Sequence, residues 1–287
     1  MKRCPLLVTG LIVASLALSG CKTRESGTGG EKLDFGGEKL QIEGSTTVEP
    51  VATRFAEQFN KEYNADVTVS GGGSGNGIGA LLDGRCDIAM SSRDMKDREL
   101  DTARQKNVEV IRVQVGIDGI CVVVHPSNMI EGISRDDLQK IYTGRITNWR
   151  QLNGPDREVT VVTRDTNSGT YEMFNKKVLK GEKVLAGART VGSNAEARTA
   201  VQNGEGAIAY VGKAFATEEV RAIPVDGVDP TEDNIHSGEY PLARALYFFT
   251  NGRPEPGSLK HAFLAFHISQ LGAKLVKAAE YLPLRQY

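Results

Sequence analysis

The chain has 287 residues, of which 40% are hydrophobic and 25% are charged, as in ordinary globular proteins. This length allows one or two domains with a large core. Lys and Arg number 35 against 36 Asp and Glu, a formal net charge of -1. The chain therefore lacks the overall basic field that favours nucleic acid or an acidic membrane surface, and we expect neither as a partner.

The N-terminus has the features of a secretory signal. Lys2 and Arg3 precede an uncharged, apolar stretch, Cys4–Gly20, which ends in Leu-Ser-Gly directly before Cys21. This ending resembles a bacterial lipobox. The resemblance implies that residues 1–20 are a lipoprotein signal peptide and that Cys21 carries the lipid of an exported, membrane-anchored protein. The alternative is an uncleaved anchor, because the stretch is near the shortest that can span a bilayer.

The next segment differs in composition from the rest of the chain. Residues 21–38 are Gly-rich and polar, which predicts a flexible tether. After it, apolar runs alternate with amphipathic stretches, and the runs predict strands at 40–43, 67–69 and 87–90. Pro50 suits the first turn of a helix that continues to about Tyr63, and a short helix is predicted at 78–82. This alternation indicates an α/β fold with a mostly parallel sheet.

A long apolar run, Val113–Val124, is interrupted only by Asp118 and Gly119. We interpret it as a strand that leaves one lobe and enters another. The second lobe is predicted to hold helices at 134–142, 170–179 and 195–203 and strands at 159–163 and 207–211. A strand at 242–250 returns, and one final helix follows Ser258, with Leu259, Phe263, Phe266 and Leu271 on its apolar face. Lobe 1 is thus 39–119 plus 242–287, and lobe 2 is 120–241.

Three loops share one design: each follows a strand, is rich in Ser, Thr and Gly, and opens a helix. They are Gly44–Thr47, Gly73–Gly77 and Arg164–Thr170. Unpaired N–H groups at a helix start favour an anion, and glycine allows close backbone approach. Ligands of open α/β sheets bind beyond the carboxyl ends of the strands, where these loops lie. Arg164 adds a guanidinium fork that suits a tetrahedral anion. A single such loop would more often be a simple helix cap.

These motifs, together with several other stretches, resemble the periplasmic phosphate-binding proteins of ABC importers, from about Leu40 to Leu284. Arg164-x-x-x-Ser168-Gly169-Thr170 matches that family's phosphate motif, Gly44-Ser45-Thr46-Thr47 its first loop and Ser74-Gly75 its second. The resemblance implies a type II two-lobed periplasmic-binding-protein fold with the ligand cleft between lobes joined by crossing strands. It also implies phosphate contacts from Ser45, Thr46, Thr47, Ser74, Arg164, Ser168, Gly169 and Thr170.

One loop departs from the family pattern. Several members carry an aspartate after the third strand, which accepts a proton from the ligand and rejects sulfate. Here the loop is Ser91-Ser92-Arg93, with Ser92 at that position. We include Ser92 and Arg93 among the candidate ligand residues. The alternative for Arg93 is a structural ion pair with Asp87 or Asp94.

The resemblance implies a binding protein that captures inorganic phosphate and delivers it to the permease of an ABC importer. We expect a monomer that is not an enzyme and that needs no metal or cofactor. The alternatives are a carrier of sulfate, molybdate or tungstate, a secreted phosphohydrolase, and a sensor or adhesin that uses the same fold without a permease. The hydrolase would need a nucleophile beside a base or clustered metal ligands, and the sequence offers no such pattern.

Two cysteines remain in the mature chain, Cys86 and Cys121, both within apolar runs. We expect them to be buried thiols. A disulfide is the alternative, because the compartment is oxidising.

Overall fold

The computed structural model describes residues 33–285. The predicted signal peptide, Cys21 and most of the predicted tether therefore lie outside the described residues. Within residues 33–285, no helix is both long and apolar enough to cross a bilayer.

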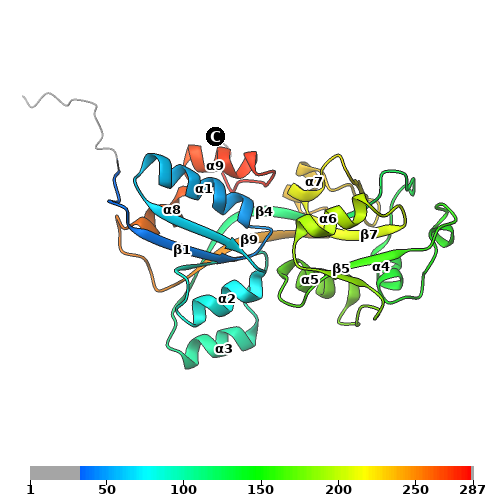
Figure 1. Ribbon diagram of the computed structural model, residues 1–287, viewed down its shortest axis with the longest axis horizontal. Helices are drawn as coiled ribbons and strands as arrows, with labels where there is room; N and C mark the ends of the chain where they lie inside the picture. Colours follow the sequence, from blue (N-terminus) through cyan, green and yellow to red (C-terminus); the bar gives the residue numbers. More distant parts are fainter. Residues whose placement is uncertain (1–32, 286–287) are drawn as a thin grey trace, which may run out of the picture. The chain divides into compact units, whose positions relative to one another are not determined.

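The first group of elements alternates strands with helices, as predicted (Figure 1). Its members are β1 (Lys39–Gly44), α1 (Glu49–Glu62), β2 (Asp66–Gly71), α2 (Ser74–Leu82), β3 (Ile88–Ser91) and α3 (Asp97–Gln105). β1 lies between β2 and β3 and pairs with both in parallel, so the carboxyl ends of all three strands meet at one edge. Pro50 lies in the first turn of α1, and the helix buries Val51, Phe55 and Phe59 on one face.

Two long strands connect this group to the next. β4 (Val110–Val124) pairs antiparallel with β9 (Ala243–Asn251) along its first part and with β7 (Ala207–Gly212) along its last five residues. Figure 1 shows β4 and β9 running from the first group of elements to the second. β4 thus takes part in both sections of the sheet, whose order is β2-β1-β3-β9-β4-β7-β5-β6, with β8 paired to β4.

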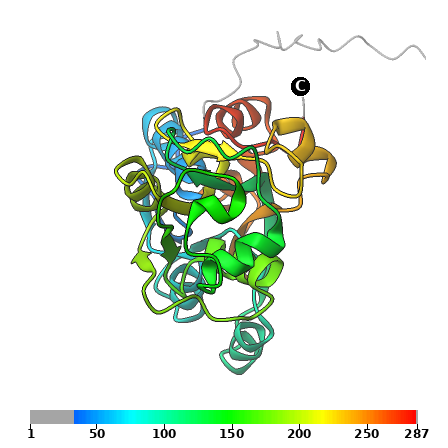
Figure 2. The same cartoon turned by 90° about the vertical axis from the view of Figure 1, so that its right-hand side faces the viewer.

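The second group, seen end-on in Figure 2 with green helices in front, repeats the parallel pattern. β5 pairs in parallel with both β6 and β7. The elements are α4 (Arg135–Tyr142), η1 (Trp149–Leu152), β5 (Thr160–Arg164), α5 (Gly169–Phe174), η2 (Asn175–Leu179), β6 (Arg189–Val191), α6 (Asn194–Gln202), η3 (Lys213–Phe215), β8 (Arg221–Ile223) and α7 (Glu232–Ser237).

Each of the two groups has one large hydrophobic core and one smaller hydrophobic cluster. One core joins Phe55 and Phe59 of α1 to Phe248 and Phe263, with aromatic ring centroids as close as 5.3 Å between Phe59 and Phe263. The other is built on Tyr142, Trp149, Phe174, Tyr210 and Tyr240. Along β4, the buried residues pass from the first core at Val115 to the second at Ile120. Leu282, near the C-terminus, packs in the second core.

Three expectations need correction. The sheet is mixed, not mostly parallel, because the crossing strands β4 and β9 pair antiparallel with each other and with their other neighbours, β7 and β3. The helix predicted at 170–179 is α5 followed by the π-helical turn η2. The single final helix is two helices, α8 (Leu259–Phe266) and α9 (Gln270–Ala278).

The break between α8 and α9 has a local cause. Ser269 caps the second helix, since its hydroxyl accepts a bond of 2.9 Å from the Gly272 N–H. A Cβ on Gly272 would lie 1.9 Å from the Phe266 carbonyl oxygen, so only glycine permits this close turn. Leu271 is 40% exposed and does not continue the apolar face of Leu259.

Cys86 and Cys121 are free, buried thiols that belong to different hydrophobic clusters. Burial raises the pKa of each thiol to about 12. The expectation of buried thiols is confirmed, and the disulfide alternative is wrong for this structure.

Candidate anion-binding site

The carboxyl ends of six strands supply the loops of the candidate site. β1, β2 and β3 lead into the loops before α1, α2 and α3, and β5, β6 and β7 end at Arg164, Val191 and Gly212. The two sets of loops are in contact: the Gly75 N–H donates to the Asn167 carbonyl oxygen at 2.9 Å. This contact unites the second and third of the predicted loops.

Arg164 is the charged group at the centre of these loops. Its side chain is buried, with 2% of the residue exposed, and no carboxylate of the described residues pairs with it. Nε donates to the Val191 carbonyl at 3.2 Å, and Nη2 donates to the Gly192 carbonyl at 2.7 Å and to Thr46 Oγ1 at 3.3 Å. Nη1 is buried and has no hydrogen-bond partner in the part of the chain that the structure describes. Burial lowers the pKa of this guanidinium, which is the response of a cation without a counter-ion.

Hydroxyl groups from both sets of loops contact one another in this region. Thr47 Oγ1 lies 3.2 Å from Thr170 Oγ1, and Ser74 Oγ lies 3.4 Å from Ser92 Oγ. These four residues are at most 1% exposed. The Asn194 amide joins Thr47 to Thr46, which contacts the guanidinium of Arg164. Buried hydroxyls and a guanidinium without a counter-ion are the groups that an oxyanion satisfies.

Gly169 is a second point at which the two sets of loops approach each other closely. A Cβ at this position would lie 2.3 Å from Ser74 Oγ and 2.6 Å from Ser92 Oγ. The sequence requirement for glycine here is therefore steric, because any side chain would push the loops apart. Ser168 precedes it and caps α5, accepting a bond of 3.2 Å from the Tyr171 N–H.

Ser45 and Arg93, which were predicted to contact the ligand, use their side chains for other hydrogen bonds. The Ser45 hydroxyl accepts bonds from the Thr47 and Val48 N–H groups, at 3.2 and 3.4 Å, and so supports the first turn before α1. Arg93 forms two bonds of 2.8 Å to the Glu99 carboxylate. The ion-pair partner of Arg93 is thus Glu99 of α3, not Asp87 or Asp94. The sequence did not predict this partner, because it did not predict helix α3.

Three further residues, Asn194, Arg244 and Asp118, complete the cluster. Asn194 opens α6 and donates through its amide to Thr46 Oγ1 at 3.2 Å and to Thr47 Oγ1 at 3.0 Å. Arg244 of β9 donates to Thr170 Oγ1 at 3.0 Å and to Thr47 Oγ1 at 3.2 Å.

Asp118 of β4 balances the charge of Arg244, with Oδ2 2.7 Å from Nη2. Burial raises the pKa of Asp118, against the lowering effect of Arg244 and of the Lys213 and Gly119 N–H groups. The pair leaves Arg164 as the cation of the cluster that has no counter-ion.

The sequence carried a signal for one of these residues. Gly192-Ser193-Asn194 follows β6 and opens α6, which is the strand–loop–helix design of the three predicted loops. It escaped notice because β6 has three residues and shows no apolar run. Arg244 stands near the start of an antiparallel strand, so only the topology reveals that it reaches the same edge.

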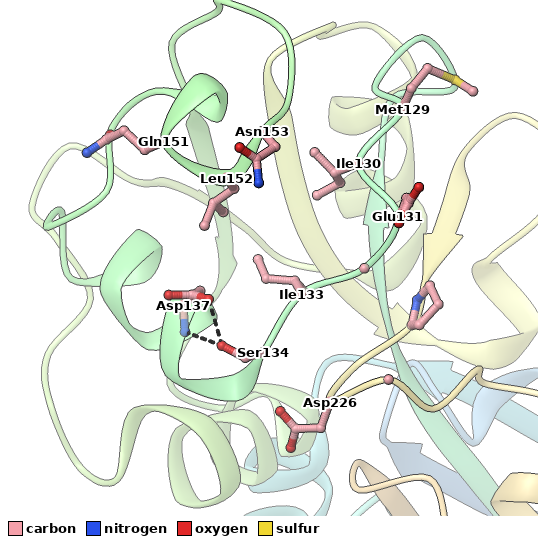
Figure 3. A pocket seen from close by; sticks show the side chains of 13 residues that line it. Met129, Ile130, Glu131, Ile133, Ser134, Asp137, Gln151, Leu152, Asn153 and Asp226 are labelled. Carbon is pink, nitrogen blue, oxygen red and sulfur yellow. Dashed lines mark hydrogen bonds between the residues drawn. The ribbon is translucent and has the colours of Figure 1, made fainter.

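A separate hollow of about 920 Å³ lies in the second group of elements (Figure 3). Three carboxylates line it, those of Glu131, Asp137 and Asp226. None of the described residues that line it is a lysine or arginine, and none belongs to the predicted ligand set. Its acidic lining disfavours an anion, so the hollow is a poor candidate for the predicted ligand.

Comparison with known proteins identifies the family to which the chain belongs. A family model described as a PBP superfamily domain matches residues 23–270. The phosphate-binding protein PstS of Bacillus subtilis is 32% identical over 266 residues, covering 92% of this chain and 86% of the relative. PstS of Staphylococcus saprophyticus is 31% identical and covers 88% of this chain and 81% of the relative.

Solved structures agree. A putative phosphate ABC transporter substrate-binding protein with bound phosphate from Clostridium perfringens has a TM-score of 0.79 and 28% identity, over 86% of this chain and 100% of the other. An ABC-type phosphate transport receptor from Vibrio cholerae has a TM-score of 0.70 and 30% identity, over 85% and 99%. The predicted type II two-lobed fold is confirmed. The chain belongs to the PBP superfamily and, within it, to the family of PstS-like phosphate-binding proteins.

Proposed function

We propose that this protein captures inorganic phosphate outside the cytoplasm and delivers it to the permease of an ABC importer. The observation that carries the proposal is Arg164, whose guanidinium is buried with 2% of the residue exposed and finds, within residues 33–285, no carboxylate partner and no hydrogen bond for Nη1. A buried charge is stable only when it is paired, and an oxyanion among the surrounding hydroxyls supplies the missing charge.

Capture would use the division into lobe 1 (39–119 plus 242–287) and lobe 2 (120–241). In this proposal Thr46, Ser74 and Ser92 contact the ligand from lobe 1, and Thr47 holds Thr170 through the contact of 3.2 Å between their Oγ1 atoms. Lobe 2 contributes Arg164, Ser168, Gly169 and Thr170. A ligand that touches both lobes favours the closed arrangement through its differential contacts, and the permease would recognise that arrangement.

The relatives support the substrate and the partner. Two curated relatives with at least 31% identity are named phosphate-binding proteins, and the solved structure from Clostridium perfringens holds phosphate. Titration calorimetry of residues 22–287 with phosphate, sulfate and molybdate tests the assignment. We expect saturable binding of phosphate at one site. Binding of molybdate alone, or of no oxyanion, would refute the proposal.

We also propose that Cys21 carries a lipid that holds the protein on the outer side of a membrane. The support is the lipobox-like Leu-Ser-Gly-Cys ending and the polar tether that follows. Cys21→Ser is expected to abolish fatty-acid labelling and either release the protein or leave an unprocessed precursor. Unchanged labelling would rule out this anchor.

A further inference from the structure

If the proposed function holds, the hydrogen-bonding groups around Asn194 decide which protonation state of phosphate the site binds. Asn194 is buried, with 0% exposed, and the orientation of its amide is fixed. Oδ1 accepts a bond of 3.2 Å from the Gly212 N–H, which can only donate. Nδ2 therefore donates its two hydrogens, one to Thr46 Oγ1 and one to Thr47 Oγ1.

The threonine hydroxyls are thereby turned into donors. A hydroxyl has two lone pairs and one hydrogen. Thr46 Oγ1 accepts from Asn194 and Arg164, and Thr47 Oγ1 accepts from Asn194 and Arg244, so both lone pairs of each oxygen are occupied. Each hydroxyl can then only donate.

Thr170 is held as a donor in the same way. Thr47 must be the donor in its 3.2 Å contact with Thr170 Oγ1, which also accepts from Arg244 Nη1 at 3.0 Å. The lone pairs of Thr170 are therefore filled as well. The hydrogens of Thr46 and Thr170 and the two N–H hydrogens of Arg164 Nη1 have no acceptor among the described residues. Four donor hydrogens on three atoms thus await an acceptor.

Acceptors are scarce by comparison. Ser92 is the one hydroxyl of the cluster to which no described N–H donates, since its oxygen contacts only Ser74 Oγ. Ser74 Oγ already accepts from the Ser92 N–H at 3.1 Å, and a bond from the Ser92 hydroxyl fills its second lone pair, which leaves the lone pairs of Ser92 for the ligand. The nearby carboxylate of Asp118 is occupied by Arg244 and the Lys213 N–H.

We propose that Asn194 and Arg244 are positioning residues that hold the threonine hydroxyls as donors, so that the site selects the dianion HPO₄²⁻ and places its one hydrogen on the Ser92 hydroxyl. The monoanion H₂PO₄⁻ carries two hydrogens on different oxygens, and the second would face a donor. Sulfate has the same shape and charge as the dianion and no hydrogen, so this site accepts it as a weaker ligand.

The first test is the pH dependence of binding, measured by calorimetry of the purified protein between about pH 5 and pH 8. Below the second pKa of phosphate, the dissociation constant for total phosphate is expected to rise about tenfold for each unit of pH, since one proton must be lost on binding. Above that pKa it is expected to be constant.

Sulfate is the control for titration of the protein itself. Its charge does not change in this range, so its dissociation constant is expected to stay constant. The charged and titratable side chains that act on the cluster include those of Arg164, Arg244, Asp118, Asp165, Glu196, Tyr210 and Tyr281. A titration of any of these groups would move the affinity for sulfate together with that for phosphate.

Two variants test the roles of the residues. Asn194→Asp replaces an obligate donor by an acceptor, so the hydroxyls of Thr46 and Thr47 donate to the new carboxylate, and neither Thr46 nor, through Thr47, Thr170 is held as a donor toward the ligand. We expect a loss of phosphate affinity on the order of 100-fold. The control Asn203→Asp adds the same charge at the exposed far end of α6 and is expected to bind like the wild type. Ser92→Ala is expected to weaken phosphate on the order of tenfold and sulfate less.

The outcomes separate this inference from the proposed function. A folded protein that binds no oxyanion would refute the function. Phosphate binding with equal or higher affinity at the acidic end would overturn the inference and leave the function intact. Undetectable sulfate binding would overturn it too, because a site built from donors has no means of rejecting that anion.

Discussion

Arg93 and Arg164 are two buried arginines that follow strand ends, yet their surroundings are opposite. Arg93 is 5% exposed and holds the Glu99 carboxylate through two bonds of 2.8 Å. Arg164 is 2% exposed and donates only to two carbonyls and one hydroxyl. A buried guanidinium with its own carboxylate stabilises the fold, whereas one without a counter-ion is suited to bind an external anion. The two residues are therefore expected to respond differently to truncation.

The largest expected effect is on stability. Arg93→Ala leaves the carboxylate of Glu99, which is 14% exposed, without its partner. Breaking a buried ion pair in this way typically costs about 3–5 kcal/mol of unfolding free energy. Denaturant unfolding measures the change. Arg112→Ala is the matched control, because its pair with Asp94 is 56% and 54% exposed and is expected to contribute less than about 1 kcal/mol.

The pH dependence of stability sharpens this prediction. Burial by itself would raise the pKa of Glu99, but hydrogen bonds from Arg93 and the Lys96 N–H, with attraction to both cations, hold the pKa below its ordinary value. The resulting stabilisation is present above the unfolded-state pKa and is lost as the pH falls through the depressed folded-state pKa. The Arg93→Ala variant should lack this loss in acid. An acid profile identical to that of the wild type would contradict the assigned pair.

Arg164 is expected to affect binding instead. Removing one partner of a desolvated charge contact costs about 2–5 kcal/mol, so Arg164→Ala should weaken phosphate roughly 30- to 5,000-fold. Arg164→Lys retains the charge but not the planar fork and should lie between the variant and the wild type. Calorimetry gives the affinity and circular dichroism the fold. Wild-type affinity in a folded Arg164→Ala protein would show that the ligand binds elsewhere.

The sequence predicts the role of Arg164 but not the ion pair of Arg93. Arg164 precedes a Ser-Gly-Thr helix start, and that local pattern predicts an anion site without tertiary information. The pairing of Arg93 depends on Glu99 in α3, whose sequence is so polar that it buries only Ala103 and shows no apolar face. A helix that packs through so little apolar surface leaves no periodic signal.

Fold prediction was limited in a similar way. Strong apolar runs correctly located β3 and β7, which are buried along their whole length, and β4, which is buried from Ile120 to Val124. β1 and the first part of β9 alternate buried residues with more exposed ones and were also located. β6 and β8, with three residues each, were missed, as was α7 with six. The direction of β9 relative to β3 is a property of the whole topology, and so is the position of Arg244 beside Thr47 and Thr170.

After the effects of Arg93 and Arg164, the next largest is expected from steric crowding at Gly169. Gly169→Ala places a methyl group within 2.6 Å of both serine hydroxyls, which must move or keep the loops apart. Such overpacking costs about 1–3 kcal/mol and should appear as a roughly 5- to 150-fold loss of phosphate affinity. Gly79→Ala in α2 is the control, since a Cβ there meets no atom within 4 Å. Equal affinities for the two variants would show that the close approach at Gly169 is not needed for binding.

The smallest expected effect belongs to the ion pair between Lys96 and Glu172, which joins the loop before α3 to α5. Both side chains are 25% exposed, so solvent screens the pair and its contribution is about 0.2–1 kcal/mol. Because the pair links the predicted lobes, it should stabilise the closed arrangement and not the folded state as such. Lys96→Ala is thus expected to weaken phosphate by no more than about fivefold, and the difference from the wild type should shrink at high salt. Lys140→Ala removes an ion pair within α4 and should leave the affinity unchanged. If Lys96→Ala lowers the melting temperature but not the affinity, the pair stabilises the fold and does not hold the closed arrangement.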